Sequence, residues 1–159
     1  MSLAPASAVL PAKASAGGAE TNNDPIESLT DGKIANSYGP IFANGVEGGM
    51  YKLDLAAVKN VGRINTFSAL GVRARQNFVL YGSSAATDPG WKVADAKIFT
   101  PIISVDTSQG MPIDFAATSI RGSAGMPLGS YRWLVWVVFP VTQENAENTA
   151  YQELQVLGE

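Results

Sequence analysis

Short runs in which apolar and polar residues alternate dominate this chain and predict strands rather than helices. Within residues 50–55, Tyr51, Leu53 and Leu55 fall on one face of an extended backbone, which is the two-residue period of a half-buried strand. Further strand-like runs are expected at residues 58–67, 76–81, 97–105, 115–120, 133–139 and 151–157. No long stretch has a helical period, and no internal repeat is present. The pattern therefore predicts an all-β sandwich or barrel of about eight short strands.

Three local features refine this prediction. Residues 133–139 are apolar at every position, which indicates a central strand covered on both faces. Pro101 interrupts residues 97–105 and predicts an edge strand or a bulge, because proline cannot donate to a ladder. Asp24 followed by Pro25 predicts a helical turn over residues 24–29, with the aspartate as its cap.

The composition of the chain changes near residue 24. Residues 1–23 are rich in Ala, Ser, Gly and Pro without periodicity, so we expect a disordered linker or expression remnant there. Residues 24–159 are expected to form the folded domain, and its ends suggest a module taken from a longer exported protein. Pro5 and Pro11 leave too short an apolar stretch for a secretory signal peptide.

The residue content argues for a binding module rather than an enzyme. The chain contains no His and no Cys, which excludes Ser-His-Asp and Cys-His catalysis and argues against a zinc hydrolase site. Nothing singles out a catalytic pair among the 14 acidic residues. With a net charge of −3 and no Lys/Arg cluster, neither nucleic acid nor anionic lipid is an expected partner. No apolar run approaches the ~20 residues of a membrane span.

Several segments, taken in order, resemble the discoidin-like family of coagulation-factor type-C domains and related carbohydrate-binding modules. The segments that carry the resemblance are Leu29-Thr30-Asp31-Gly32, Tyr51-Lys52-Leu53-Asp54-Leu55, Phe78-Val79-Leu80-Tyr81-Gly82-Ser83, Tyr131-Arg132-Trp133-Leu134-Val135-Trp136 and Glu153-Leu154-Gln155-Val156. The resemblance covers residues 26–158. One departure is the aromatic residue expected soon after the Asp-Gly turn, which Tyr38 or Phe42 must replace. The resemblance implies a galactose-binding-like jelly-roll β-sandwich of about eight antiparallel strands, with variable loops at one end.

The resemblance also implies a structural calcium ion near the Asp-Gly turn. Side-chain oxygens for its shell would come from four residues, namely Asp31, Asn36, Ser37 and Glu153. Carbonyl groups near Lys33 would complete the six to eight oxygens that Ca²⁺ prefers. The alternative is that Asp31 only caps a turn and Glu153 is an exposed strand residue.

A sugar-binding face needs an aromatic plane and a few polar groups for hydroxyls. The candidate contacts are Arg73, Arg75, Tyr38, Asn44 and Arg121. The alternative is that the two arginines of residues 68–77 only solvate a loop or pair with Asp95 or Asp106. The three tryptophans are expected in the core.

The function that these observations favour is recognition of carbohydrate or surface glycan by a non-catalytic module of a larger exported protein. Such a module would lie outside the cell, in a periplasm or at a cell surface, beside neighbouring domains of the same chain. The alternative is a structural or protein-interaction domain with no small-molecule ligand. An exposed aromatic ring beside Arg73 and Arg75 in a concave site would favour sugar binding, whereas a flat apolar patch would favour docking.

Overall fold

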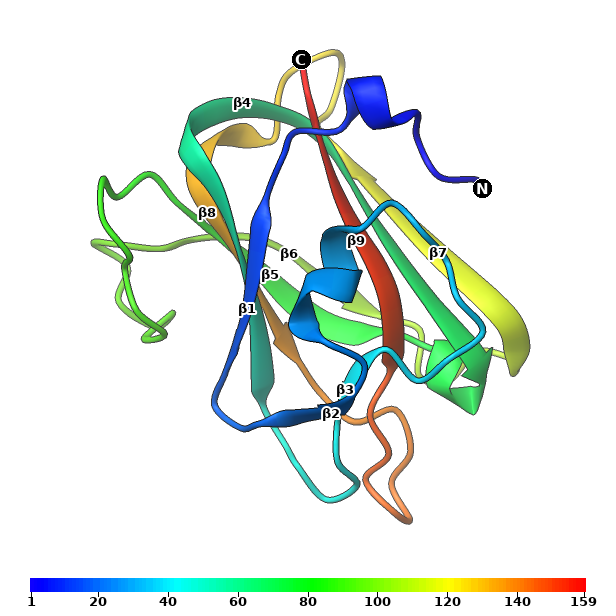
Figure 1. Cartoon of the computed structure of the whole chain (residues 1–159). Coiled ribbons are helices and arrows are strands. Elements are labelled where there is room, and N and C mark those ends of the chain that lie inside the picture. Colours follow the sequence, from blue (N-terminus) through cyan, green and yellow to red (C-terminus); the bar gives the residue numbers. More distant parts are fainter.

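A single bent strand joins the two layers of the structure, which is a computed structural model of residues 1–159 (Figure 1). Strand β4 (Gly49–Gly71) changes register between Asp54 and Lys59. At this bend Ala56 has a φ of 65°, and its amide donates to Asp54 Oδ1 over 2.8 Å. The two runs expected at residues 50–55 and 58–67 are therefore one continuous strand that passes from one sheet into the other.

The two halves of β4 pair with different partners, and every pairing is antiparallel. The first half lies in a sheet of order β1-β4-β8-β5-β6, and the second half lies between β7 and β9. The bounds of these strands are β1 (Lys13–Gly17), β5 (Asn77–Ser83), β6 (Thr100–Asp106), β7 (Ile113–Arg121), β8 (Gly129–Val138) and β9 (Ala150–Gly158). The short strands β2 (Thr21–Asn23) and β3 (Pro40–Phe42) pair separately, and the 3₁₀ helices are η1 (Ala6–Ala8), η2 (Ile26–Thr30) and η3 (Val72–Ala74). The predicted antiparallel β-sandwich is confirmed, with nine strands rather than about eight.

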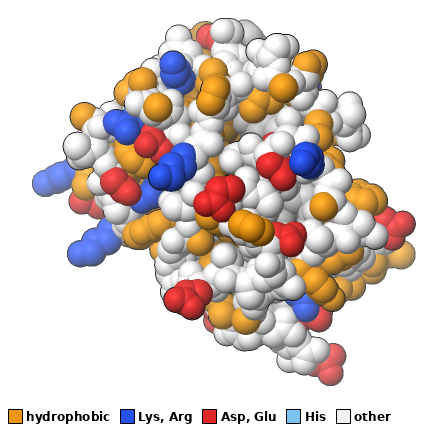
Figure 2. Space-filling view, in the orientation of Figure 1, with side chains coloured by type: hydrophobic (Ala, Val, Ile, Leu, Met, Phe, Trp, Pro, Cys, Tyr) orange, Lys and Arg blue, Asp and Glu red, His pale blue; other side chains and the backbone are white.

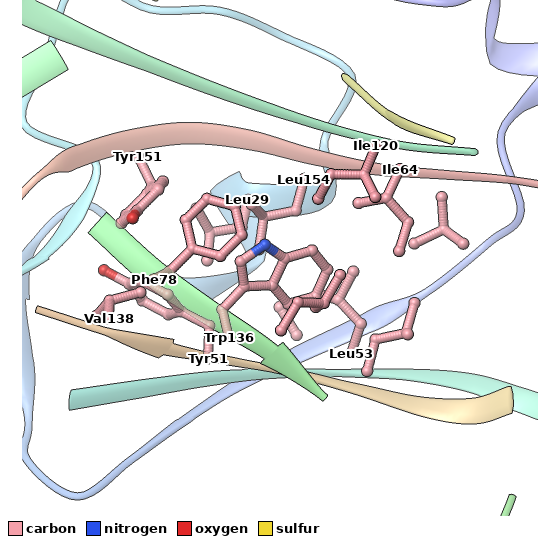
Figure 3. Close-up of a cluster of buried hydrophobic side chains, with 14 of the residues drawn as sticks. Leu29, Tyr51, Leu53, Ile64, Phe78, Ile120, Trp136, Val138, Tyr151 and Leu154 are labelled. Carbon is pink, nitrogen blue, oxygen red and sulfur yellow. The ribbon is translucent and has the colours of Figure 1, made fainter. Parts of the chain in front are cut away.

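The core lies between the two sheets, and aromatic residues fill its centre (Figure 3). Trp136 of β8 is fully buried, and its indole N–H donates to Thr66 Oγ1 across the sandwich over 3.3 Å. Tyr51 and Tyr151 pack edge to face, with 5.6 Å between ring centroids. Phe42 packs on Tyr51 at 5.0 Å and is buried. Of the two aromatic residues that could follow the Asp-Gly turn, Phe42 therefore serves the core and leaves Tyr38 at the surface.

The local predictions about strands are confirmed, and the predicted helix cap is wrong. Strand β8 is central between β4 and β5, and β6 is an edge strand whose register shifts next to Pro101. The helical turn forms as η2, but Pro25 occupies its cap position and makes no side-chain cap bond. Asp24 instead accepts a hydrogen bond from Ser37 Oγ over 2.5 Å, which ties the start of η2 to the loop that follows it.

The predicted boundary at residue 24 is wrong, because residues before it belong to the sandwich. Strand β1 pairs with the first half of β4 from Lys13 to Gly17, and Val9 forms a bridge with Leu157. Gly17 lies directly beneath the indole of Trp91, where an added Cβ would come within 2.4 Å of the ring. Small residues allow this close packing, while the pairing itself uses backbone groups that leave no hydrophobic period in the sequence.

Candidate ligand-binding site

Three of the five predicted contacts, Tyr38, Asn44 and Arg73, lie together at one surface pocket. Tyr38 precedes β3, Asn44 follows it, and Arg73 lies in η3 directly after β4. The pocket has a volume of about 210 Å³ and is lined by Asn22, Asn23, Tyr38, Ile41, Phe42, Ala43, Asn44 and Arg73. Tyr38 is 48% exposed, so its ring is available to a ligand.

Arg73 is held in place by three hydrogen bonds. Its Nη1 donates to the Asn148 carbonyl over 3.1 Å, and its Nη2 donates to Asn44 Oδ1 over 2.9 Å and to Glu147 Oε1 over 3.1 Å. The guanidinium carbon lies 5.6 Å from the centroid of the Tyr38 ring, within cation–π range. Only 14% of the Arg73 side chain is exposed. The guanidinium is therefore fixed before any ligand arrives, which reduces the entropy lost on binding.

The backbone at the end of β4 directs Arg73 toward the pocket. Leu70 and Gly71 both have positive φ, 74° and 62°, so the chain turns sharply out of the strand and into η3. Because β-branched or bulky residues rarely adopt this conformation, Leu70 is a strained position. Such strain is found where surrounding contacts fix a local geometry, as the three Arg73 hydrogen bonds do here.

Asn148 joins the two loops beside the pocket. This residue is 1% exposed, and its Nδ2 donates to the carbonyls of Ala43 (3.0 Å) and Val46 (2.9 Å). The loop between β3 and β4 is thereby bound to the loop between β8 and β9. Two loops that are remote in sequence therefore hold one side of the site.

The other two predicted contacts lie elsewhere. Arg75 donates through Nη1 to the Ser108 carbonyl over 3.2 Å and lines a different cavity beside β7. Arg121 is exposed and lies opposite Arg63, at the end of the β4–β7 ladder remote from η3. Sequence proximity to Arg73 misplaced Arg75, because Arg73 lies within the η3 turn whereas Arg75 lies in the extended backbone that follows it. Arg75 and Arg121 therefore do not line the Tyr38 pocket.

Glu147 is a residue at this site that sequence reasoning missed. It is the ionic partner of Arg73, whereas the sequence suggested Asp95 or Asp106 as a partner. Its loop has no motif, so only the folded chain brings it beside η3.

Three of the four predicted calcium ligands lie around the Asp-Gly turn, where Asp31 lines one cavity with Glu153 and a second cavity with Ser37. Both oxygens of Glu153 accept hydrogen bonds from the Gly32 amide over 3.2 Å, and Glu153 is only 2% exposed. Burial raises the pKa of Glu153 to about 8, although the amide hydrogen bonds oppose this effect. In this structure both carboxyl oxygens accept the Gly32 amide, whereas as calcium ligands they would bind the ion. Glu153 is therefore not the exposed strand residue of the alternative interpretation.

The remaining predicted ligands serve the turn itself. Asp31 Oδ1 accepts the Lys33 amide over 2.9 Å, as the turn-capping alternative expected. Asn36 is exposed, and Ser37 hydrogen-bonds to Asp24. No group of three or more His, Cys, Asp or Glu side chains lies close enough to hold a metal ion. Calcium binding at this turn stays a prediction.

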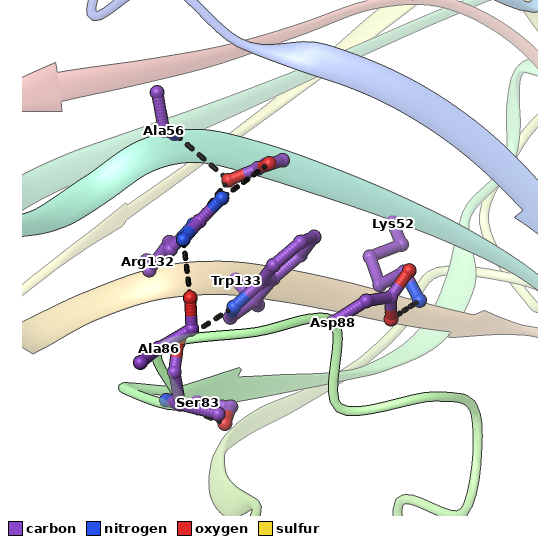
Figure 4. A network of polar contacts seen from close by, with 9 residues as sticks. Lys52, Ala56, Ser83, Ala86, Asp88, Arg132 and Trp133 are labelled. Carbon is purple, nitrogen blue, oxygen red and sulfur yellow. Dashed lines mark hydrogen bonds and ion pairs between the residues drawn. The ribbon is translucent and has the colours of Figure 1, made fainter.

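A polar network on the outer face of the first sheet was also missed (Figure 4). Lys52 is 2% exposed, and its ammonium lies 2.5 Å from Asp88 Oδ1 and 4.0 Å from the centroid of the Trp91 ring. Arg132 pairs with Asp54 at 2.8 Å and stacks over Trp133. Trp133 and Trp136 are buried as predicted, but Trp91 is only half-buried, because it covers Lys52 rather than the core.

This network attaches residues 84–99 to the sheet. The Trp133 indole donates to the Ala85 carbonyl over 2.9 Å, and Arg132 Nη1 donates to Ala86. In Figure 2, Lys and Arg side chains gather on the left of the molecule, and Asp and Glu lie among them. The network therefore holds a long loop in place, and its charges are already paired.

Exposed apolar side chains lie along β7 and just before it. Met111, Ile113 and Phe115 are 83%, 49% and 52% exposed, and β7 pairs only with β4. This exposed apolar edge is the feature that favours the protein-interaction alternative, whereas the Tyr38 pocket is the feature that favours sugar binding. No helix of the chain has the length and hydrophobicity needed to cross a membrane.

Searches with protein-family models and among curated proteins found no match. Solved structures do match. The family 32 carbohydrate-binding module of NanJ from Clostridium perfringens, in complex with galactose, has a TM-score of 0.63 at 12% identity, covering 94% of this chain and 97% of that one. The family 32 module of AlyQ, in complex with 4,5-unsaturated mannuronic acid, has a TM-score of 0.58 at 18% identity, covering 94% and 95%.

A third match is the module CpGH89CBM32-5 from Clostridium perfringens in complex with GalNAc-β-1,3-galactose, with a TM-score of 0.62 at 13% identity and coverage of 94% and 99%. A truncated AlyQ that also contains an alginate lyase domain matches too, and this chain covers 33% of it. At identities this low the structural matches establish the fold alone. They extend over nearly the whole chain. The chain has the galactose-binding-like, or discoidin-like, β-sandwich fold that its motifs predicted.

Proposed function

We propose that this chain is a non-catalytic module that binds carbohydrate or a surface glycan through Tyr38, Asn44 and Arg73. The observation that carries the proposal is the meeting of an exposed aromatic ring, a fixed guanidinium and an amide at one pocket. An aromatic face packs on the C–H face of a pyranose, while a few convergent polar groups bind its hydroxyls. The modules of the same fold that carry bound sugars support this proposal.

Binding would be reversible and would break no bond. The chain has no His or Cys, and Arg73 and Asn44 offer hydrogen bonds rather than a nucleophile or general base at neutral pH. Some of the matched modules belong to longer enzyme chains. This supports a setting in which the module holds an attached domain at its substrate in an exported protein, outside the cell, in a periplasm or at a cell surface.

The experiment compares glycan retention by the wild-type chain with retention by Tyr38→Ala and Arg73→Ala on a glycan array. We expect both substitutions to abolish retention, because each removes one of the groups that meet at the pocket. Tyr38→Phe should keep most of the affinity, since it keeps the ring face. Arg121→Ala is the matched control, because it removes the same charge from an exposed position at the other end of the β4–β7 ladder.

Thermal melting of each variant separates lost binding from lost folding. The Tyr38 ring is half exposed, so Tyr38→Ala should leave the melting temperature within about 2 °C of wild type. Retention that persists in a folded Tyr38→Ala variant, or that disappears in Arg121→Ala, would refute this assignment of the site.

A further inference from the structure

We infer that Glu147 makes the Tyr38 pocket select uncharged sugars over uronic acids, an inference that rests on the proposed function. The fold itself does not decide the charge of the ligand, because the matched modules include one with galactose and one with an unsaturated mannuronic acid. The preference for a neutral or a charged sugar must therefore come from charged residues near the pocket of this chain.

Arg73 is the one charged residue that lines the pocket. Its Nη2 lies 3.1 Å from Glu147 Oε1, and the two side chains are only 14% and 23% exposed. At this distance and burial the pair is poorly screened by solvent, and the carboxylate cancels most of the field of the guanidinium. A ligand carboxylate in the pocket would meet little net attraction from Arg73 and direct repulsion from Glu147.

The hydrogen bonds of Arg73 also disfavour binding of a ligand carboxylate. Nη2 already donates to both Asn44 and Glu147, so the paired donors that would grip a ligand carboxylate in a bidentate fashion are in use. The guanidinium keeps other N–H groups for a sugar hydroxyl, and Asn44 adds a polar group at the rim. Such a site matches neutral hydroxyls, which both donate and accept.

Glu147 itself is not among the residues that line the pocket. It acts on the ligand through Arg73 and through its charge, rather than by contact. Replacing its charge while keeping its shape is therefore the informative change. Glu144 provides the matched control, because it lies exposed in the same loop and forms no ion pair.

The experiment measures dissociation constants by isothermal titration calorimetry at low ionic strength for three pairs of methyl glycosides. Each pair differs only at C6, as hydroxymethyl or carboxylate: galactoside and galacturonide, glucoside and glucuronide, mannoside and mannuronide. In every pair that binds, we expect the wild type to prefer the neutral sugar by about tenfold or more. Glu147→Gln should strengthen uronide binding by about tenfold and change binding of the neutral sugar by less than about threefold.

Glu144→Gln should leave the preference unchanged, although it alters the net charge by the same amount. A wild type that prefers a uronide, or a folded Glu147→Gln variant with an unchanged ratio, would overturn the inference while leaving glycan binding intact. Binding of none of the six glycosides, with no retention on the array, would instead overturn the proposed function and the inference with it.

Discussion

The buried carboxyl of Glu153 should make this protein lose stability as the pH rises through neutrality. In the folded state burial raises the pKa of this group from 4.5 to about 8, whereas in the unfolded chain it returns to its ordinary value. The native state therefore binds the proton more tightly than the unfolded state. Its stabilising effect is complete below about pH 4.5 and is lost as the pH rises through about 8.

The size of this effect follows from the two pKa values. One pKa unit corresponds to about 1.4 kcal/mol, so the free energy of unfolding should fall by up to ~5 kcal/mol between pH 4.5 and pH 9. Relaxation around the charged carboxylate reduces this figure to a few kcal/mol. The chain contains no His, so almost nothing else titrates in this interval. The pKa values of Asp54, Asp88 and Asp106 are lowered, chiefly by side-chain hydrogen bonds, and affect stability only in acid.

Urea denaturation at half-unit steps from pH 5 to pH 9 measures this slope. Glu153→Gln keeps an acceptor for the Gly32 amide without a charge, so its stability should be nearly independent of pH and should exceed that of the wild type above pH 8. Glu27→Gln makes the same change at an exposed position of η2 and should follow the wild-type curve. A flat wild-type curve, or stability that rises with pH, would refute the reasoning.

Two further predictions concern the Asp31 turn and the packing of β1 beneath Trp91. If Asp31 and Glu153 bind calcium as the family resemblance implies, the melting temperature should be several degrees higher in 5 mM CaCl₂ than in EDTA; equal melting temperatures would show that Glu153 keeps its amide hydrogen bonds and that the turn binds no ion. Gly17→Ala should cost about 1–3 kcal/mol, because its Cβ would meet the Trp91 ring at 2.4 Å. Gly62→Ala, whose Cβ would meet nothing closer than 3.3 Å, should cost less, and equal losses in urea denaturation would show that the indole moves aside freely.

The sequence predicted the strands well where one face of the strand packs in the core and the other face points away from it. Tyr51 and Leu53 alternate with polar residues because only one face of the first half of β4 meets the core. The same rule misjudged Glu153 and Gln155, which look exposed by alternation but are buried. Segments near Gly32 and Ala4 cover the outer face of β9 and hydrogen-bond to these side chains. The residue pattern of a strand cannot show which distant segment folds back over it.

The sequence predicted which types of residue form the site, but only some of the individual residues. An aromatic residue with Arg and Asn on nearby loops was enough to select Tyr38, Asn44 and Arg73. The partner of Arg73 lies more than seventy residues later, on a loop whose position depends on Asn148 and on the pairing of β9. Strand β1 was missed for a related reason, since its Ala, Ser and Gly residues contribute backbone hydrogen bonds rather than an apolar pattern.

The bent strand β4 couples the unfolding of the two sheets, because it belongs to both of them. One continuous backbone pairs with β1 and β8 in its first half and with β7 and β9 in its second half. Proteolytic cleavage near Ala56, at the exposed bend, would separate the two halves of β4, and only β8 would still pair with both of them. Because η3 continues directly from β4, the guanidinium of the pocket is attached to a strand that pairs with four others, and recognition should persist until the whole domain melts.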